Sequence, residues 1–348
     1  MRGAAGSSDG LAPALLDHLR VQLGAPDVDF AEPLTVVSGG FDTRVFAFRL
    51  SGAATPWSGP LILRVLNPAH DPLRALKERA TQNALGALGY PVPRVLAACA
   101  DPAPLGGAFL VMERARGRPL LDDRIRGASV TLADAQVRLH ALDAETLLRA
   151  LDDEGRAAGG AFARGAIAYD GHLAALGRRV RRASLTGLAA GLTWLRDHRP
   201  AGGARVICHC DFHPQNLLAE GGRVTAVLDW PNVLVAEPEC DVAATLVILR
   251  LTPITLLPLP AALRPFVAAL RPVMVARYLA RYRRARSLVA SRLAYYEAAA
   301  CMRGLVRAAE ARVGGATTPL DASEFGECLA ARFTRVSGVP VALPPGSR

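Results

Sequence analysis

The feature that most constrains the fold of this chain is a spaced set of polar residues beyond its midpoint. Residues 208–216 read CHCDFHPQN and contain the pattern His-x-Asp-x-x-x-x-Asn, with His209, Asp211 and Asn216 at its fixed positions. The run RVTAVLDW (223–230) is typical of a strand and ends in Asp229. We expect it to form a hairpin with the strand RVICHC (205–210), which would bring two carboxylates and one carboxamide together.

These oxygen-bearing side chains fit the chemistry of phosphoryl transfer. One carboxylate in such a site accepts the proton of the attacking hydroxyl group. A carboxamide and a second carboxylate are hard oxygen ligands that hold Mg²⁺ on nucleotide phosphates. The plain alternative is that Asp211 and Asp229 are a turn residue and a helix cap.

Two cysteines and two histidines in the same stretch raise the alternative of a zinc site. Zinc needs three or four ligands that converge on one point. Cys208 and Cys210 can share one side of a strand, but His209 would then point to the other side. No second Cys/His cluster at a suitable spacing completes the set, so the sequence favours magnesium. The six scattered cysteines include no CxxC pair, and we expect reduced thiols.

The chain divides into a strand-rich first part and a helical second part. In the first part, the patterns predict helices at 11–24 and 73–88 and strands at 34–37, 44–50, 61–66 and from 109. Helical patterns dominate 131–200, apart from a loop at 155–170, and again 241–335. We interpret His140, in the segment RLHALD, as a helix-packing or locally hydrogen-bonded residue.

These motifs make the chain similar to the aminoglycoside phosphotransferase family, in the wide sense that includes choline, macrolide and other small-molecule kinases. The specific matches are HCDFHPQNLL (209–218) and VLDWPNVLVAEPECDVA (227–243). Looser matches extend the resemblance from about residue 34 to 310: SGGFDTRVFAF, LILRVL, KERATQNALGALGYPVPRVL, FLVMERARGRPL and LADAQVRLHALD.

The resemblance implies an α+β, two-lobed protein-kinase-like fold with a small antiparallel-sheet N-lobe and a larger helical C-lobe. We expect a nucleotide-binding lobe at 1–115 with a hinge at its end. A catalytic and substrate-binding lobe would follow at 116–338, with a tail at 339–348.

The resemblance also assigns roles to the residues of the C-lobe motifs. Asp211 would orient or deprotonate the hydroxyl group of the acceptor. Asn216 and Asp229 would bind Mg²⁺. His209 would support the catalytic loop, and Asp241 would hold this loop through backbone N–H groups.

A site for the phosphoryl donor, ATP or GTP, is implied in the N-lobe. Its expected residues are those of a nucleotide loop, Ser38, Gly39 and Gly40, and of a hinge, Met112, Glu113 and Ala115. Glycines let the loop backbone approach the phosphates closely. In the hinge, the Glu113 C=O and the Ala115 N–H would read the adenine edge, and Met112 would line the back of the pocket.

Two positions depart from the family pattern. Arg64 stands on the strand position that usually carries lysine, and the only lysine, Lys77, lies on the following helix. Paired with Glu78, Arg64 could still clamp the α- and β-phosphates, because a guanidinium is always charged and bidentate. Cys210 stands where the family often has glycine, which suggests a tighter loop.

The expected function is therefore a magnesium-dependent kinase of a small hydroxylated molecule. Segment 242–320 contains two carboxylates, Glu297 and Glu310, against twelve arginines, which argues against a polycationic aminoglycoside as the acceptor. The apolar run at 246–260 favours a macrolide-like, acyl-type or other apolar or anionic acceptor.

Other function classes are less well supported. Replacement of lysine by Arg64 raises the alternative of a pseudokinase-like, nucleotide-binding regulatory protein. The net charge of +10 raises that of a nucleic-acid binder, but the arginines are dispersed and no RNA-binding signature occurs. The most apolar region, 246–275, is interrupted by arginines and prolines, so we expect no membrane span. Without an apolar segment near residue 1, a cytoplasmic location is expected.

Overall fold

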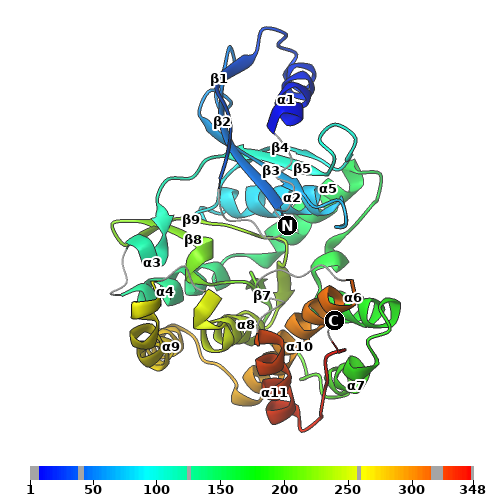
Figure 1. Cartoon of the computed structure of the whole chain (residues 1–348), viewed down its shortest axis with the longest axis vertical. Helices are drawn as coiled ribbons and strands as arrows, with labels where there is room; N and C mark the ends of the chain where they lie inside the picture. The colour runs from blue at the N-terminus through cyan, green and yellow to red at the C-terminus, as the bar shows by residue number, and fades with distance from the viewer. Residues whose placement is uncertain (1–7, 38–42, 124–126, 257–259, 315–323, 346–348) are drawn as a thin grey trace. The chain divides into compact units, whose positions relative to one another are not determined.

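The computed structural model describes residues 8–37, 43–123, 127–256, 260–314 and 324–345. The chain forms two compact units. Unit 1 contains Met1–Gly117, Thr146–Ala163 and Thr225–Pro231, and unit 2 contains Arg118–Glu145, Arg164–Val224 and Asn232–Arg348. Figure 1 labels the elements of both units along the chain.

Unit 1 is built on an antiparallel sheet of five strands in the order β1-β2-β3-β5-β4. The strands are β1 (Asp29–Val36), β2 (Thr43–Ser51), β3 (Pro60–Leu66), β4 (Val95–Cys99) and β5 (Phe109–Glu113). Two longer helices belong to this unit, α1 (Ser8–Leu23) and α2 (Arg74–Ala87).

Alternation along β3 places its side chains on two faces of the sheet. Leu61, Leu63 and Val65 join a buried cluster with residues of α1. Leu66 belongs to a second cluster that includes Ala75 of α2. Because Arg64 is an even-numbered residue of the same strand, it shares the face of Leu66 and points towards α2.

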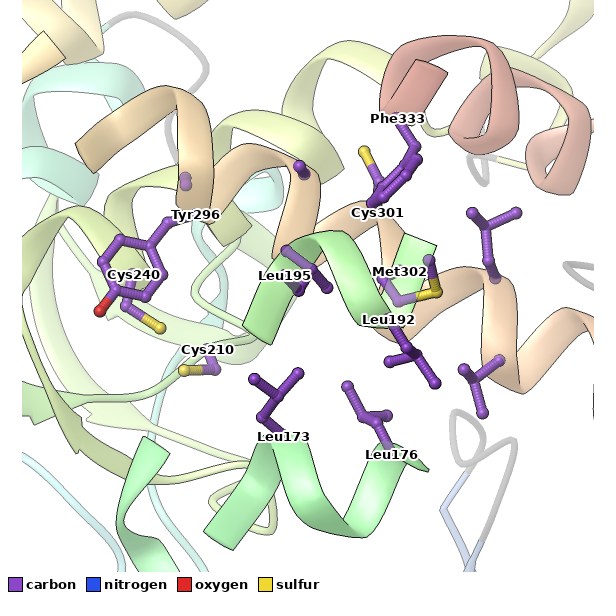
Figure 2. Close-up of a cluster of buried hydrophobic side chains, with 14 of the residues drawn as sticks. Leu173, Leu176, Leu192, Leu195, Cys210, Cys240, Tyr296, Cys301, Met302 and Phe333 are labelled. Carbon is purple, nitrogen blue, oxygen red and sulfur yellow. The ribbon is translucent and has the colours of Figure 1, made fainter. Parts of the chain in front are cut away.

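Unit 2 is mainly helical, and its core forms where several helices meet. Its longer helices are α4 (Ala128–His140), α6 (Tyr169–Arg182), α7 (Ala189–Asp197), α8 (Pro238–Leu251), α9 (Arg264–Ala285), α10 (Ala290–Gly314) and α11 (Phe325–Ser337). Figure 2 shows leucines of α6 and α7 packed with Tyr296, Met302 and Phe333 from α10 and α11. Cys210 and Cys240 lie in the same cluster.

Shorter elements complete the chain. The strand β6 (Arg118–Pro119) leads into α3 (Leu120–Asp123), and α5 (Ala144–Ala157) runs from unit 2 into unit 1. Four short strands lie between residues 206 and 236: β7 (Val206–Cys208), β8 (Leu217–Glu220), β9 (Arg223–Val227) and β10 (Leu234–Ala236).

The expected hairpin between 205–210 and 223–230 is wrong. The strand β7 pairs with β10, and β9 neighbours β8 instead. The reason is the Gly221-Gly222 pair, whose φ angles of 60° and 81° form a tight two-residue turn between β8 and β9. The short strand β8, which the sequence analysis did not predict, therefore takes the place expected for β7.

The predicted fold class is confirmed, with a small antiparallel sheet of five strands and a larger helical part. The lobe boundaries at residues 115 and 338 stay a prediction. In the ranges that the structure describes, no helix combines the length and apolarity needed to cross a membrane.

Candidate active site

The segment 209–216 forms a loop that folds back on itself in unit 2. It leaves β7 and ends in a 3₁₀ turn, Pro214–Asn216, directly before β8. The Asn216 side-chain Nδ2 donates to the Asp211 C=O at 2.9 Å and lies 3.5 Å from Asp211 Oδ2. The loop thus places the Asn216 carboxamide beside the Asp211 carboxylate.

The Asp211 side chain is partly exposed, whereas the nearby His209 is buried. The Asp211 side chain is 28% exposed, with His213 Nε2 at 3.8 Å from its Oδ1. His209 is fully buried, and its Nδ1 accepts a hydrogen bond from the Asp211 N–H at 3.2 Å. Asp211 is therefore accessible from outside, while the backbone that carries it is fixed from within.

Cys210 has a left-handed backbone conformation, with φ of 61°. This conformation costs a residue with a Cβ roughly 1–2 kcal/mol, and glycine adopts it freely. The left-handed conformation explains why glycine suits this position, whereas the tighter loop expected with cysteine stays a prediction. Here Cys210 is buried in the core of unit 2, as Figure 2 shows.

Two residues of α8 hold the loop backbone on either side of Asp211. Asp241, in the first turn of α8 and fully buried, accepts a hydrogen bond from the Cys210 N–H at 2.6 Å. One turn further, Thr245 Oγ1 donates to the Phe212 C=O at 2.9 Å. A helix N-terminus also stabilises a carboxylate through its dipole.

His140 is a neighbour of Asp241 that the sequence analysis did not assign to the site. Its Nε2 lies 3.0 Å from Asp241 Oδ2, so its contacts are long-range rather than local. Burial acts to raise the pKa of Asp241, but the hydrogen bond with the His140 ring opposes it, and the pKa lies below its usual value. The available signal was Gln136 and His140, two polar residues four apart on the mainly apolar face of a helix.

Arg64 of unit 1 is held between two carboxylates. Its Nη1 donates to Glu78 Oε2 and its Nη2 to Asp229 Oδ1, both at 2.9 Å. Arg74 Nε also donates to Glu78, at 3.2 Å, and the Glu78 side chain is only 1% exposed. Burial acts to lower the pKa of Arg64, but Glu78 and Asp229 outweigh it and raise this pKa.

Asp229 follows β9 at a left-handed position, with φ of 64°. The next residue, Trp230, is fully buried, stacks edge-on against Tyr90 and donates its Nε1–H to the Val227 C=O at 2.9 Å. This anchor fixes the turn that presents the Asp229 carboxylate, which is 39% exposed. Asp229 is a residue of unit 1, whereas Asp211 and Asn216 belong to unit 2.

The predicted hinge residues lie at the end of β5. Met112 is buried, and the Glu113 N–H donates to the Arg94 C=O at 3.0 Å. Ala115 follows the strand, and Ser38, Gly39 and Gly40 lie outside the described residues. Lys77 pairs with Asp71 at 3.0 Å. It takes no part in the group of Arg64, Arg74, Glu78 and Asp229, here termed the Arg64 cluster.

The zinc alternative gains no support. Within the described ranges, no three His, Cys, Asp or Glu side chains are arranged to hold a metal ion. All six cysteines are free thiols, and Cys208, Cys210 and Cys240 are buried. These thiols pack in the core, as expected for reduced cysteines.

A family model described as the phosphotransferase enzyme family matches residues 33–288 of the chain. The chain belongs to this phosphotransferase family. The match includes the loop 209–216, Arg64, Glu78 and Asp241, and the resemblance inferred from the sequence is confirmed.

Solved structures share the fold of this chain. A putative aminoglycoside phosphotransferase from Ralstonia eutropha JMP134 superposes with a TM-score of 0.61 at 19% identity, over 94% of this chain and 97% of that chain. A thermostable mutant of aminoglycoside phosphotransferase APH(4)-Ia, in complex with AMP-PNP and hygromycin B, gives 0.56 at 20% identity, over 94% and 100%. Macrolide 2′-phosphotransferase type I gives 0.53 at 19% identity, over 96% and 98%. At these identities the likeness shows the fold alone.

Curated relatives that match this chain carry a different kind of name. "Acyl-CoA dehydrogenase family member 11" from Pongo abelii is 25% identical over 224 residues, which is 61% of this chain and 26% of the relative. The same-named protein from Rattus norvegicus is 30% identical over 182 residues, 48% of this chain and 22% of the relative. The chain thus spans about a quarter of the length of these relatives.

Replacement of Glu78 by Gln should destabilise the protein. The substitution keeps the shape of the side chain but leaves the buried Arg64 with one carboxylate instead of two. Because removal of one partner of a buried ion pair leaves a charge poorly compensated, we expect a loss of about 3 kcal/mol in the free energy of unfolding. Chemical denaturation measures this loss.

Glu32→Gln is the matched control in the same unit, because Glu32 forms an exposed pair with Arg49 at 3.8 Å. Exposed pairs contribute at most about 1 kcal/mol. Equal, small effects of both substitutions would contradict a stabilising role for the Arg64 cluster.

Proposed function

We propose that the chain is a Mg²⁺-dependent O-phosphotransferase that transfers the γ-phosphoryl group of ATP or GTP to a hydroxyl group of a small molecule. The observation that carries the proposal is the loop 209–216, in which Asp211 is accessible while Asp241 and Thr245 hold the backbone on both sides of it. Phosphoryl transfer depends mostly on positioning and electrostatic stabilisation, so a fixed carboxylate in a tight loop suits it.

In this proposal Asp211 accepts the proton of the acceptor hydroxyl group. Asn216 and Asp229 are the ligands of Mg²⁺, which supplies charge stabilisation on the nucleotide phosphates. Both side chains fit the ion chemically, because Mg²⁺ prefers oxygen ligands. Since Asn216 uses its Nδ2 to bind the Asp211 C=O, its Oδ1 is the atom left for a cation.

Arg64 takes the role of the usual lysine on the nucleotide phosphates. Its guanidinium is already oriented by Glu78 and stays charged at any physiological pH. The solved complex of a fold neighbour with AMP-PNP supports an adenine nucleotide as the donor. Intact Asp211, Asn216 and Asp229 count against the pseudokinase-like alternative.

The two carboxylates of segment 242–314 are both ion-paired with arginines of the protein, which supports an acceptor that is not a polycation. Glu297 is bound by Arg250 and Arg332, at 3.2 Å and 2.7 Å. Glu310 receives a bidentate contact from Arg179, at 2.6 Å and 3.0 Å. Both carboxylates are neutralised by arginines of the protein itself, which leaves arginine in excess and favours an anionic or apolar acceptor.

The names of the relatives suggest two acceptor classes that fit this charge. The curated relatives are named for acyl-CoA dehydrogenases, and a fold neighbour is a macrolide phosphotransferase. In a hydroxylated acyl compound with an anionic group, the acyl chain suits the apolar run at 246–260 and the anionic group suits the excess of arginine. We therefore place a hydroxyacyl compound first and a macrolide-like compound second.

The acceptor prediction can be checked by the release of ADP from MgATP with three acceptors: a hydroxyacyl thioester, a macrolide and kanamycin. We expect the thioester or the macrolide to stimulate release and kanamycin to be poor. EDTA should abolish the stimulation. Fast phosphorylation of kanamycin would contradict the charge argument, and no stimulation by any hydroxylated acceptor would contradict the proposed activity.

Asn216→Ala should weaken the dependence on Mg²⁺ through loss of a proposed ligand. We expect the Mg²⁺ concentration for half-maximal turnover to rise by roughly tenfold, the size of effect that removal of one contact of about 1.4 kcal/mol produces. Gln215→Ala removes a carboxamide from the neighbouring position and serves as the matched control. If both variants titrate with Mg²⁺ as the wild type does, Asn216 is not a ligand.

A further inference from the structure

The helix α9 carries two buried tyrosines that no step of the proposed mechanism uses. Most of α9 is exposed, and its buried side chains are Val275, Tyr278 and Tyr282. The tyrosines are four residues apart, so they lie on the same face of the helix, one turn from each other. Each hydroxyl group begins a hydrogen-bonded chain that ends on the backbone of the catalytic loop.

The first chain, here termed the Tyr278 relay, runs through α4 and α8. The Tyr278 hydroxyl group donates to Gln136 Oε1. Gln136 Nε2 donates to Thr245 Oγ1 at 3.2 Å, and Thr245 Oγ1 donates to the Phe212 C=O at 2.9 Å. Every donor in this relay points towards the loop, so each bond fixes the orientation of the next group.

The second chain, the Tyr282 relay, lies one helical turn away. The Tyr282 hydroxyl oxygen is 2.6 Å from His140 Nδ1, and His140 Nε2 is 3.0 Å from Asp241 Oδ2. Asp241 Oδ1 accepts the Cys210 N–H at 2.6 Å. This relay therefore ends on the residue before Asp211, and the Tyr278 relay ends on the residue after it.

The two relays share one construction. Each of α9, α4 and α8 contributes two polar residues that are four apart: Tyr278 and Tyr282, Gln136 and His140, Asp241 and Thr245. All six side chains are buried, with no more than 1% of any of them exposed. Buried polar groups that are all hydrogen-bonded rigidify the backbone to which they bind.

We infer that Tyr278 and Tyr282 are positioning residues of the phosphotransfer reaction, which fix the backbone on both sides of Asp211 through α4 and α8. The inference rests on the proposed function for its catalytic consequence. In the Tyr282 relay the phenol is the donor to Nδ1. His140 is then the neutral tautomer that carries its proton on Nε2 and donates it to Asp241.

The acid–base state of the tyrosines agrees with this direction. Burial raises the pKa of Tyr282 and of Tyr278 well above the usual value, and the charge of Asp241 adds to the effect. Both phenols therefore keep their protons. Removal of the Tyr282 hydroxyl group would leave Nδ1 without its donor, so the Nε2–H tautomer that donates to Asp241 would no longer be fixed.

The experiment compares Tyr282→Phe and Tyr278→Phe with the wild type. Tyr169→Phe is the matched control, because the Tyr169 hydroxyl group donates to Tyr295, which donates to the Leu195 C=O and not to the catalytic loop. Hydrogen exchange of the peptide 209–213 and ¹⁵N NMR of the His140 ring are measured without ligand. Hydrolysis of MgATP is measured by ADP release.

We expect the amide hydrogen-exchange rate in 209–213 to rise by about tenfold in both relay variants but not in Tyr169→Phe. This rate is proportional to the equilibrium constant for local opening of the loop. The wild-type His140 ring should show protonated Nε2 and unprotonated Nδ1, and this pattern should change in Tyr282→Phe. Turnover of MgATP should fall by about tenfold with KM within about twofold, as for lost positioning rather than lost binding.

Exchange and ring signals equal to those of the wild type in Tyr282→Phe would overturn the inference. If Tyr282→Phe does not fold, the wild-type ring decides: protonated Nδ1 overturns the relay, and unprotonated Nδ1 supports it. Absence of MgATP turnover in the wild type would refute the proposed function, and the exchange and NMR measurements would still test the positioning of the loop.

Discussion

The hydrogen bond from the Cys210 N–H to the buried Asp241 carboxylate is the interaction on which the proposed active site depends. Hydrogen bonds to charged groups contribute about 1.5–3 kcal/mol, which exceeds the cost of the left-handed backbone at Cys210. A buried carboxylate is itself costly unless its oxygens are hydrogen-bonded. His140 and Cys210 satisfy both oxygens of Asp241, so the loop and the carboxylate stabilise each other.

In unit 1 the charge that its surroundings compensate is positive instead of negative. Arg64 is a largely buried cation, 12% exposed, and Glu78 and Asp229 compensate it on two sides. The substitution of the usual lysine is therefore accommodated by a planar guanidinium that reaches both carboxylates at once. Each unit thus fixes one of the proposed functional carboxylates through a charged group that the core encloses.

Much of this arrangement could be predicted because it follows from short-range rules. The resemblance to the family implied that Arg64 and Glu78 pair, and alternation along β3 explains why Arg64 faces the helix of Glu78. The spacing from His209 to Asn216 predicts the loop that the proposed function uses. The hairpin partner of β9 could not be predicted, since β8 has only four residues and its pairing depends on the turn at Gly221 and Gly222.

The relays were not predicted because they depend on contacts distant in sequence. His140 and Tyr282 are 142 residues apart, and nothing in the local sequence of either indicates the other. The many arginines and exposed residues of α9 also conceal the buried face that Tyr278 and Tyr282 share. Buried polar residues four apart on a helix, as in Gln136 and His140, are the local sign of such a network.

The most direct test of the account is acceptor-dependent turnover of MgATP in Asp211→Asn, with Asp153→Asn as a control in an exposed ion pair. The substitution preserves the shape of the side chain and removes its negative charge, and with it the ability to accept a proton. The account predicts that turnover falls by about 10²–10⁴-fold in Asp211→Asn, the range typical of a lost general base, and is unchanged in Asp153→Asn. Equal turnover in Asp211→Asn and the wild type would contradict it.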